Sequence, residues 1–331
     1  MRLKGSPGLG ARQPRCWAGM TLVAALLCAP PSRAAPASPT LAAHASTRAP
    51  LPSQGCRFAP EERTLKGRGL HLQRTLSTGG TTRRFLLVLP EQQPATPMPL
   101  VLNFHGWFES PQLHQLLTRM DPQTRARGWA LAYPQGAGLS WNAGLCCGRA
   151  LEEGRDDVRF ARDLVGQLGR ELCLDLRRVY ATGISNGGFL SYRLACEAGD
   201  LIAAAAPVAA LDALPSCAPG RPVPLLAING TGDFIVPTEG GGFLALPSAQ
   251  QTFASWRARN RCAAGEREAF AQGDSRCVVA EGCAADTVAC TVDGGGHTWP
   301  GGHPAVWLGK TTQELDGTGT ILAFFAGQAR E

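Results

Sequence analysis

Residues 178–190 read RVYATGISNGGFL, and this stretch carries the most information about the fold. Residues 179–183 form a short apolar run typical of a buried strand, and residues 186–196 have a helical pattern. Ser185 lies between them, with Gly183 and Gly187 two residues away on either side. Side chains at those two positions would collide with neighbouring elements in a sharp turn, so the stretch predicts a strand, a strained turn and a helix.

Apolar runs and helical patterns alternate on both sides of this stretch. Further strands are expected at residues 84–89, 100–104, 129–133, 202–208, 223–228 and 287–292, and further helices at residues 156–172 and 248–261, the latter opening with a Ser248 cap. We interpret Asp156 and Asp157 as capping and dipole compensation of the first of these helices. The alternation predicts the α/β class, with a mainly parallel central sheet covered by helices on both faces. In such sheets ligands bind beyond the carboxyl ends of the strands.

The first 55 residues differ in composition from the rest. Residues 1–15 are basic without acids, residues 17–29 are almost wholly apolar, and Ser32-Arg33-Ala34 supplies small residues for cleavage, so residues 1–34 are expected to be an export signal. The apolar part is too short to span a membrane. A lipid anchor on Cys28 is disfavoured by the preceding Leu26-Leu27. Residues 35–55 are expected to be an Ala/Pro-rich linker, and residues 56–331 a single domain.

Charge gives little indication of a partner. The net charge of +6 falls to +1 once residues 1–34 are removed, because that segment holds five positive residues and no negative one. A nearly balanced chain without a Lys/Arg cluster gives no reason to expect nucleic acid or an anionic membrane as a partner. We therefore expect a monomer that acts on a small or polymeric substrate.

Ten cysteines remain after the export signal, and their even number in an exported chain favours disulfides. They are Cys56, Cys146, Cys147, Cys173, Cys196, Cys217, Cys262, Cys277, Cys283 and Cys290. Metal binding is the competing reading, but their spacing does not fit the paired pattern of zinc sites. The last four are near enough in the chain to staple one region among themselves. The protein is expected outside the cell or in a periplasm.

Ser185 is the candidate nucleophile, because a serine on a strained strand-to-helix turn projects its Oγ into the cleft. The backbone amide of Asn186 would then sit at a helix N-terminus and could donate to a developing oxyanion. A glycine-rich turn without catalysis is the alternative.

A serine hydroxyl needs a base, and His297 is the best candidate among the histidines outside the leader. It lies in the loop GGGHTWPGG, residues 294–302, which follows an expected strand. His303 is the fallback. The other candidates are His71, His105 and His114.

The acid should lie between Ser185 and His297 in the chain, because α/β-hydrolases order their triad as serine, acid, histidine. Asp233 follows an expected buried strand through a short turn, which places it at the same edge as Ser185. It would fix the tautomer of His297 and stabilise the imidazolium. A turn aspartate bonding to its own backbone is the alternative. The other aspartates in this interval are Asp200, Asp212, Asp274, Asp286 and Asp293.

The segment NFHGW, residues 103–107, follows an early expected strand. In this arrangement the loop donates a second oxyanion amide, which we assign to the backbone of Trp107. His105 is interpreted as a residue that positions the loop.

Several motifs together resemble one known group: NFHGW, WNAGLCCG at residues 141–148, DDV at 156–158, GISNGG at 183–188, GTGD at 230–233 and GGGHTWPGG. The sequence is similar to the secreted polyhydroxybutyrate depolymerase and feruloyl esterase family, of the carbohydrate-esterase family 1 type, over nearly all of residues 80–305. The resemblance implies an α/β-hydrolase fold, Ser185, Asp233 and His297 as the triad, and Trp299 beside the substrate. Asn229 departs from the pattern, since relatives usually have histidine there, which puts the local hydrogen bonding in doubt.

These observations predict a serine esterase that works through an acyl-enzyme and needs no metal or organic cofactor. The expected substrates are feruloyl or acetyl esters on plant polysaccharide, or hydroxyalkanoate polyesters, with exposed Trp141 and Trp299 in contact with the substrate. The lack of an appended binding module argues against specialisation for solid polymer. The alternatives are an acyltransferase on the same fold and an inactive extracellular binding domain.

Overall fold

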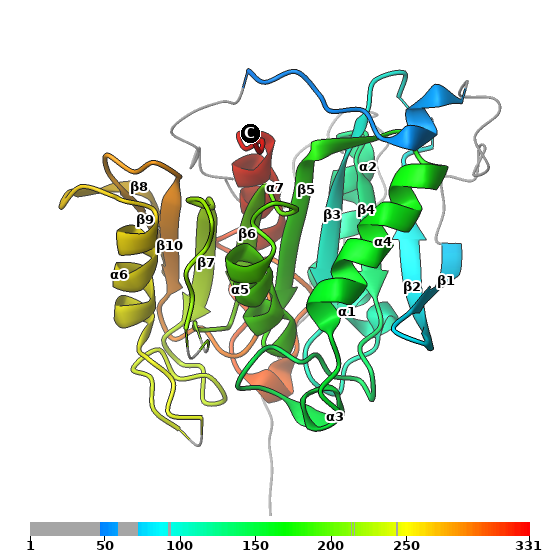
Figure 1. Cartoon of the computed structure of the whole chain (residues 1–331). Helices are drawn as coiled ribbons and strands as arrows, with labels where there is room; N and C mark the ends of the chain where they lie inside the picture. The colour runs from blue at the N-terminus through cyan, green and yellow to red at the C-terminus, as the bar shows by residue number, and fades with distance from the viewer. Residues whose placement is uncertain (1–46, 59–71, 92–93, 213, 215, 243) are drawn as a thin grey trace, which may run out of the picture. The chain divides into compact units, whose positions relative to one another are not determined.

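The predicted alternation of strands and helices is present in the computed structural model, which describes residues 47–58, 72–91, 94–212, 214, 216–242 and 244–331 (Figure 1). The expected export signal and the first part of the expected linker lie outside the described residues. The described residues group as one compact unit. Within the described part, no helix is long and apolar enough to cross a membrane.

The centre of the fold is a ten-stranded sheet in the order β1-β2-β4-β3-β5-β6-β7-β10-β9-β8. The strands are β1 (Leu72–Thr78), β2 (Thr81–Val88), β3 (Met98–Phe104), β4 (Ala130–Pro134), β5 (Leu174–Ile184), β6 (Ala204–Val208), β7 (Leu225–Gly230), β8 (Glu266–Gln272), β9 (Ser275–Ala280) and β10 (Thr287–Val292). The six strands from β4 to β10 in this order pair in parallel, and the antiparallel pairs lie at the two ends. The parallel centre confirms the predicted α/β class.

Helices cover both faces of this sheet (Figure 1). They are α1 (Pro111–Thr118), α2 (Met120–Ala126), α3 (Gly148–Glu152), α4 (Asp157–Glu171), α5 (Asn186–Glu197), α6 (Ala249–Arg259) and α7 (Gly317–Ala326), with short 3₁₀ turns η1 (Gln54–Arg57) and η2 (Val306–Leu308). Apolar residues of α4, α5 and α6 pack on one face, and those of α2 and α7 on the other. The predicted Ser248 cap of α6 is confirmed, because its hydroxyl accepts the N–H of Gln251 in a capping box.

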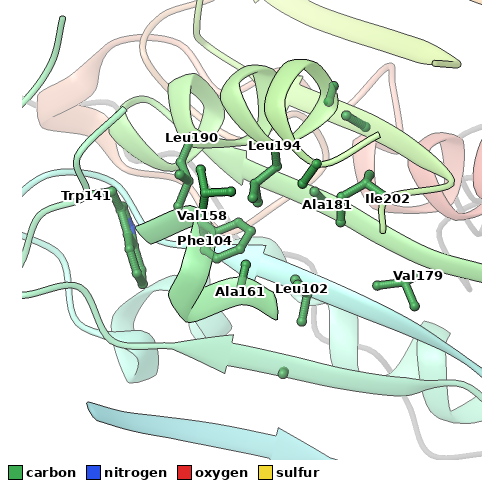
Figure 2. Close-up of a cluster of buried hydrophobic side chains, with 14 of the residues drawn as sticks. Leu102, Phe104, Trp141, Val158, Ala161, Val179, Ala181, Leu190, Leu194 and Ile202 are labelled. Carbon is green, nitrogen blue, oxygen red and sulfur yellow. The ribbon is translucent and has the colours of Figure 1, made fainter. Parts of the chain in front are cut away.

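The two cores follow from the alternation of side chains along the central strands. Leu102 and Phe104 of β3 point to the α4–α5 face and pack with Val158, Leu190 and Leu194 (Figure 2). The intervening residues of the strands face α2 and α7. Each fully buried leucine or phenylalanine contributes about 1.5–3 kcal/mol, so these layers hold the strand ends, and the loops that follow them, in place.

The folded part begins earlier in the chain than expected. Residues 51–55 were assigned to a linker, but Leu51 and Ser53 hydrogen-bond to the segment that enters β5. The N–H of Leu51 donates to Asp175, the N–H of Ser53 donates to the carbonyl of Leu174, and the Ser53 hydroxyl donates to Leu172. A disulfide between Cys56 and Cys173 closes the same contact. The boundary at Cys56 is therefore corrected toward the N-terminus.

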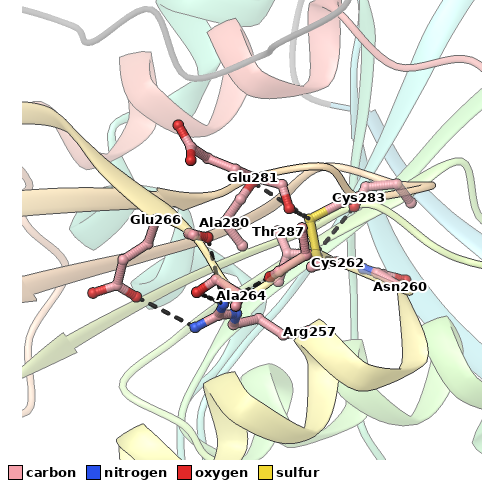
Figure 3. The surroundings of a disulfide bond; sticks show 12 residues. Arg257, Asn260, Cys262, Ala264, Glu266, Ala280, Glu281, Cys283 and Thr287 are labelled. Carbon is pink, nitrogen blue, oxygen red and sulfur yellow. Dashed lines mark hydrogen bonds and ion pairs between the residues drawn. A yellow bond between two sulfur atoms is a disulfide. The ribbon is translucent and has the colours of Figure 1, made fainter.

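All ten cysteines predicted to form disulfides are paired, in five bonds. Cys196 pairs with Cys217, and Cys146 pairs with its neighbour Cys147. The last four pair among themselves as expected, Cys262 with Cys283 and Cys277 with Cys290. They staple the β8–β10 end of the sheet, where α6 ends beside the loop that enters β10 (Figure 3).

Candidate active site

Ser185 lies at the sharp turn between β5 and α5. Its φ of 55° and ψ of −124° place a non-glycine residue in a strained part of backbone space. The turn is tight because α5 begins directly against the end of β3. A β-carbon on Gly183 would lie 2.4 Å, and one on Gly187 2.1 Å, from the carbonyl oxygen of Phe104. The two glycines are therefore required by backbone contact, which confirms the predicted strand, turn and helix.

Asp233 and His297 form a buried hydrogen-bonded pair. Nδ1 of His297 lies 2.6 Å from Oδ2 of Asp233. The other carboxylate oxygen, Oδ1, accepts the backbone N–H groups of Ile235 and Val236, each at 2.8 Å. These bonds fix the carboxylate, which in turn orients the imidazole with Nδ1 protonated and, in the neutral ring, the lone pair on Nε2. Within the described part of the chain, that Nε2 makes no hydrogen bond.

Glycines allow close contact between the two loops that carry Asp233 and His297. A β-carbon on Gly230, at the end of β7, would lie 2.3 Å from the carbonyl oxygen of Gly295 in the loop after β10. On its other side this loop packs against residues 308–310, because the N–H of His297 donates to the carbonyl of Leu308 at 2.7 Å. A β-carbon on Gly296 would strike the same carbonyl at 2.3 Å. The glycines before His297 thus permit a close backbone passage between two segments.

The serine and the acid–histidine pair follow strands whose carboxyl ends lie at the same edge of the sheet (Figure 1). They follow β5, β7 and β10, and β6 lies between β5 and β7. Backbone hydrogen bonds continue beyond the strand ends: the N–H of Ser185 donates to Val208 at 2.9 Å, and the N–H of Ala209 donates to Ile228 at 2.8 Å. The ladder ends with the N–H of Thr231, which donates to β10 at 2.9 Å. The carboxyl edge is therefore one continuous hydrogen-bonded surface.

The loop after β3 carries the predicted Trp107 amide. The carbonyl of Gly106 accepts from Nδ1 of His105 at 2.7 Å and from the N–H of Glu109 at 3.2 Å. Because a trans peptide is planar, the N–H of Trp107 points away from that fixed carbonyl. Neither this N–H nor that of Asn186, the first of α5, has an acceptor among the residues that the structure describes. That these two amides donate to an oxyanion stays a prediction.

The predicted loop-positioning residue His105 is fully buried. Its Nε2 accepts the N–H of Gly136 at 2.9 Å, while Nδ1 donates to Gly106. Burial lowers the pKa of His105 to about 4. The ring is therefore neutral near pH 7, as its one donor bond and one acceptor bond require.

A second buried pair, Glu109 and His114, was not predicted as part of the site. Oε2 of Glu109 accepts the N–H of Gly106 at 2.9 Å and lies 3.2 Å from Nδ1 of His114. The other ring nitrogen of His114 bonds Oδ1 of Asn103 at 2.7 Å. Burial raises the pKa of Glu109, but the nearby His114 and the hydrogen bond from the N–H of Gly106 together outweigh burial and leave the pKa below its usual value. A carboxylate two residues after the NFHGW segment was the only signal in the sequence.

Trp141 and Trp299 were expected to be exposed to substrate, and that expectation is wrong. Trp141 is 0% exposed and Trp299 is 2% exposed. The indole N–H of Trp299 donates to the hydroxyl of Thr318 on α7, and the Trp141 ring packs edge-on against Phe104 (Figure 2). Both indoles complete the core beneath the edge, so neither ring face is open to a ligand.

Asp157 also differs from the expectation, whereas its neighbour Asp156 caps α4 by accepting the N–H of Arg159. Asp157 is buried, and its two carboxylate oxygens bond Arg83 at 3.0 Å and the N–H of Asn142 at 2.8 Å. Burial raises its pKa despite the charge of Arg83. It therefore ties the WNAGLCCG segment to α4, in addition to lying in the first turn of that helix as the dipole interpretation requires.

The fallback residues have other surroundings. His303 is exposed, and its backbone N–H donates to Leu117. The remaining aspartates bond elsewhere: Asp200 to Arg162, Asp212 to Arg259, Asp274 to Lys310, Asp286 to Gln328 and Asp293 to Thr231. Asn229 accepts the N–H of Ala210 at 3.1 Å, which resolves the local bonding that its departure from the motif put in doubt. The described residues contain no cluster of side chains suited to a metal ion.

Large exposed apolar side chains gather on the loops of the carboxyl edge. Those on the loops after β3, β4, β7 and β10 are Trp107, Phe108, Leu145, Phe234, Ile235, Val306 and Trp307. The rings of Trp107 and Phe108 stack with their centroids 4.6 Å apart. Phe234 directly follows Asp233, and Trp307 precedes the residue that accepts the N–H of His297. We call these seven residues the apolar rim.

Solved structures with the same fold include an acetyl xylan esterase from Aspergillus awamori, with a TM-score of 0.55 and 15% identity over 70% of this chain and 94% of the other. A thermostable esterase gives a TM-score of 0.51 at 15% identity, over 78% of this chain and 63% of the other. These likenesses show the fold, which is that of the α/β-hydrolases.

No protein-family model matches the chain. Feruloyl esterase B of Piromyces equi is 32% identical over 218 residues, which are 60% of this chain and 39% of that larger protein. Feruloyl esterase D of Neurospora crassa is 29% identical over 78% of this chain and 86% of its own length. NocK of Nocardia uniformis subsp. tsuyamanensis, named as a candidate esterase, is 31% identical over 90% of this chain and 92% of its own. The chain belongs to this family of carboxylic-ester hydrolases with the α/β-hydrolase fold, the carbohydrate-esterase group that its motifs resemble.

Proposed function

We propose that this protein is a serine esterase in which Ser185 is the nucleophile, His297 the general base and Asp233 the acid that orients it. The observation that supports this most directly is the buried 2.6 Å bond between Asp233 and Nδ1 of His297. It leaves Nε2 as the basic nitrogen at the edge where the strained turn presents Ser185. A carboxylate in this position stabilises the imidazolium without taking its proton.

The proposed reaction has two acyl-transfer steps. Oγ of Ser185 forms a bond to the ester carbonyl carbon while its proton passes to Nε2 of His297. The negative charge that develops on the carbonyl oxygen is held by the N–H groups of Trp107 and Asn186. Collapse breaks the ester C–O bond, and the leaving alcohol takes the proton from His297. Water then attacks the acyl-enzyme with His297 as base, and the acid is released.

Labelling with a fluorophosphonate probe tests this assignment. The folded, disulfide-intact protein should form one adduct, located on Ser185 by peptide mass analysis, and Ser185→Ala should form none. Ser248→Ala, which removes a serine at the cap of α6, serves as the control and should label like the wild type. Absence of the adduct from the wild-type protein would reject the serine-esterase mechanism.

For the substrate, we propose an ester with an aromatic or other apolar acyl part. The support is the apolar rim, in which Phe234 and Trp307 are each 66% exposed beside the acid–histidine pair. Feruloyl and acetyl esters of plant polysaccharide and hydroxyalkanoate polyesters remain the candidates.

Methyl ferulate, a short aryl acetate and a hydroxybutyrate oligomer should be assayed side by side, and kcat/KM for the preferred ester should fall in Phe234→Ala. Equally slow turnover of all three esters would argue against this substrate class.

We also propose that the protein is exported and acts as a monomer. Five disulfides fit an oxidising compartment. Residues 1–34 have the composition of an export signal. N-terminal sequencing of the protein recovered from culture medium tests the cleavage after Ala34, and sedimentation of that material tests the monomer.

A further inference from the structure

The two proposed oxyanion donors come from separate elements, the loop after β3 and the first turn of α5. Two amides stabilise one oxygen atom only if their separation and directions are fixed before the reaction. Direct backbone contact between α5 and the loop after β3 fixes part of this geometry. A β-carbon on Gly187 would lie only 2.7 Å from the carbonyl oxygen of His105. The remaining connection runs through a third segment, the loop that begins at Trp141.

The backbone of Trp141 is bound to the side chain of Asn186. Oδ1 of Asn186 accepts the N–H of Trp141 at 2.6 Å, and Nδ2 of Asn186 donates to the carbonyl of Trp141 at 2.9 Å. The amide side chain thus pairs with both polar groups of one residue, as a neighbouring strand would. Since Asn186 also provides one proposed oxyanion N–H, Trp141 is fixed relative to that donor.

The side chain of Trp141 reaches the other donor loop. Its indole N–H donates to the carbonyl of His105 at 2.9 Å, two residues before the Trp107 amide. The same His105 holds the carbonyl of Gly106 through Nδ1. One residue therefore bonds to both donor-bearing segments, to α5 through its backbone and to the β3 loop through its indole.

Trp141 is held rigidly enough to set the separation of the Trp107 and Asn186 amides. It is fully buried, and its ring packs edge-on against Phe104 (Figure 2), with the ring centroids 5.2 Å apart. The ring of Phe160 stacks on it with a centroid separation of 6.1 Å. Asp157 fixes the chain on its C-terminal side by accepting the N–H of Asn142 at 2.8 Å. An indole that only filled the core would need no bond to His105, because an apolar ring of similar size would fill the same space.

We propose that Trp141 is a positioning residue of the ester-hydrolysis site, which sets the separation of the Trp107 and Asn186 amides by bridging them. The proposal rests on the proposed function. The two amides bind the oxygen more strongly as it becomes an oxyanion, so a misplaced pair weakens the transition state more than substrate binding. The signature is a loss of kcat with little change in KM.

The test replaces Trp141 by phenylalanine, which keeps an aromatic ring and removes the indole N–H. Removal of an oxyanion donor costs about 100-fold or more in kcat, so a displaced donor should cost about tenfold. An aryl boronic acid, which forms a tetrahedral adduct with a catalytic serine, should bind Trp141→Phe about tenfold more weakly, while KM for an aryl ester changes less than about twofold. The control is Trp256→Phe, because Trp256 is also fully buried but its indole N–H has no partner among the described residues.

Equal kcat and boronate affinity in Trp141→Phe and Trp256→Phe would overturn the proposal, as would a rise in KM alone. If Trp141→Phe does not fold, benzothienylalanine at position 141 decides by the same criteria, because it puts sulfur in place of the N–H at nearly the same shape. Failure of the proposed function has a different signature: the wild-type protein then lacks the Ser185 adduct and the boronate affinity altogether.

Discussion

The carboxyl edge and the β8–β10 end of the same sheet are built in opposite ways. At the edge, buried ionisable groups, a strained serine and close glycine contacts bring five loops together. At the β8–β10 end, β8 is largely exposed, it pairs with the mainly buried strand β9, and two disulfides hold the strands and the end of α6. In the first region, buried side chains and close backbone contacts surround the proposed catalytic residues. In the second, two disulfides add covalent links to the apolar side chains that β9 and β10 bury, such as Val279 and Val288.

This difference indicates where a substitution should change activity and where it should change stability. Groups at the edge act in the transition state, so their loss should appear in kcat before it appears in unfolding. Disulfides act largely on the unfolded chain, so their loss should appear in the free energy of unfolding alone. The predictions below test this separation.

The largest effect is expected for the base. His297→Gln should lower kcat about 10⁶-fold, the loss known for the catalytic histidine of subtilisin, because glutamine cannot take the proton from Ser185. His303→Gln is the matched control, because His303 is exposed and only six residues away. Ester hydrolysis by the purified variants measures both. Comparable losses in the two variants would mean that the base has been misassigned.

Asp233→Asn should cost about 10⁴-fold in kcat, the loss recorded for the same change in a serine protease triad, because an amide no longer requires Nδ1 of His297 to be protonated. The folded structure should be retained, as the amide can still accept the N–H groups of Ile235 and Val236. Asp293→Asn is the control, since that exposed carboxylate bonds only Thr231 among the side chains described. Near wild-type turnover of Asp233→Asn would contradict the proposed role of Asp233 in catalysis.

The parts of this arrangement that depend on local chemistry could be predicted from the sequence. The Ser185 turn needs glycines at fixed positions, and a strand followed by a turn predicts which residues reach the edge, as with Asp233 and His297. Residues close together in the sequence determine these features, so predicting them does not require knowing which distant segments come into contact. The α/β class follows for the same reason, from periodicity alone.

Features that depend on distant contacts could not be predicted. A tryptophan in a glycine-rich segment looks the same whether it faces a ligand or the core, and Trp141 is buried because β3 and α4 pack on it from far away in the sequence. The pair of Glu109 and His114 depends on the loop after β3 folding back on itself. Strand β8 begins with charged, exposed residues and lacks a clear alternation, so its pairing with β9 appears only in the folded sheet.

At the β8–β10 end, which two disulfides hold, a substitution should lower stability and leave activity unchanged. The double variant Cys262→Ala/Cys283→Ala should lose about 3 kcal/mol of unfolding free energy, as expected for a closed loop of about 20 residues, with kcat unchanged. The pair lies between the end of α6 and the loop before β10, beside the carbonyl groups that Arg257 binds (Figure 3). Urea unfolding and ester hydrolysis of the same samples provide both values. A fall in kcat at temperatures where the variant is fully folded would show that the two regions are coupled.

The last prediction concerns a pH dependence of stability that arises at the carboxyl edge. Burial lowers the pKa of His105 to about 4 in the folded protein, while the unfolded chain has an ordinary value of about 6.5. The unfolded state therefore binds more protons between these values, so His105 reduces stability as the pH falls from 6.5 to 4. The full loss is on the order of 3 kcal/mol, and about half of it should be present near pH 5.

His105→Gln should flatten this slope, because a glutamine side chain offers one donor for Gly106 and one acceptor for Gly136 but does not titrate. The measurement is urea unfolding of both proteins at several pH values between 4 and 7, and the difference between the curves isolates His105 from Glu109 and the other carboxylates. Glu268→Gln, which removes an exposed ion pair with Arg276 at the stapled end, should change the slope little, since surface pairs contribute about 0–1 kcal/mol. If His105→Gln kept the wild-type slope, the acid sensitivity would arise outside the oxyanion loop.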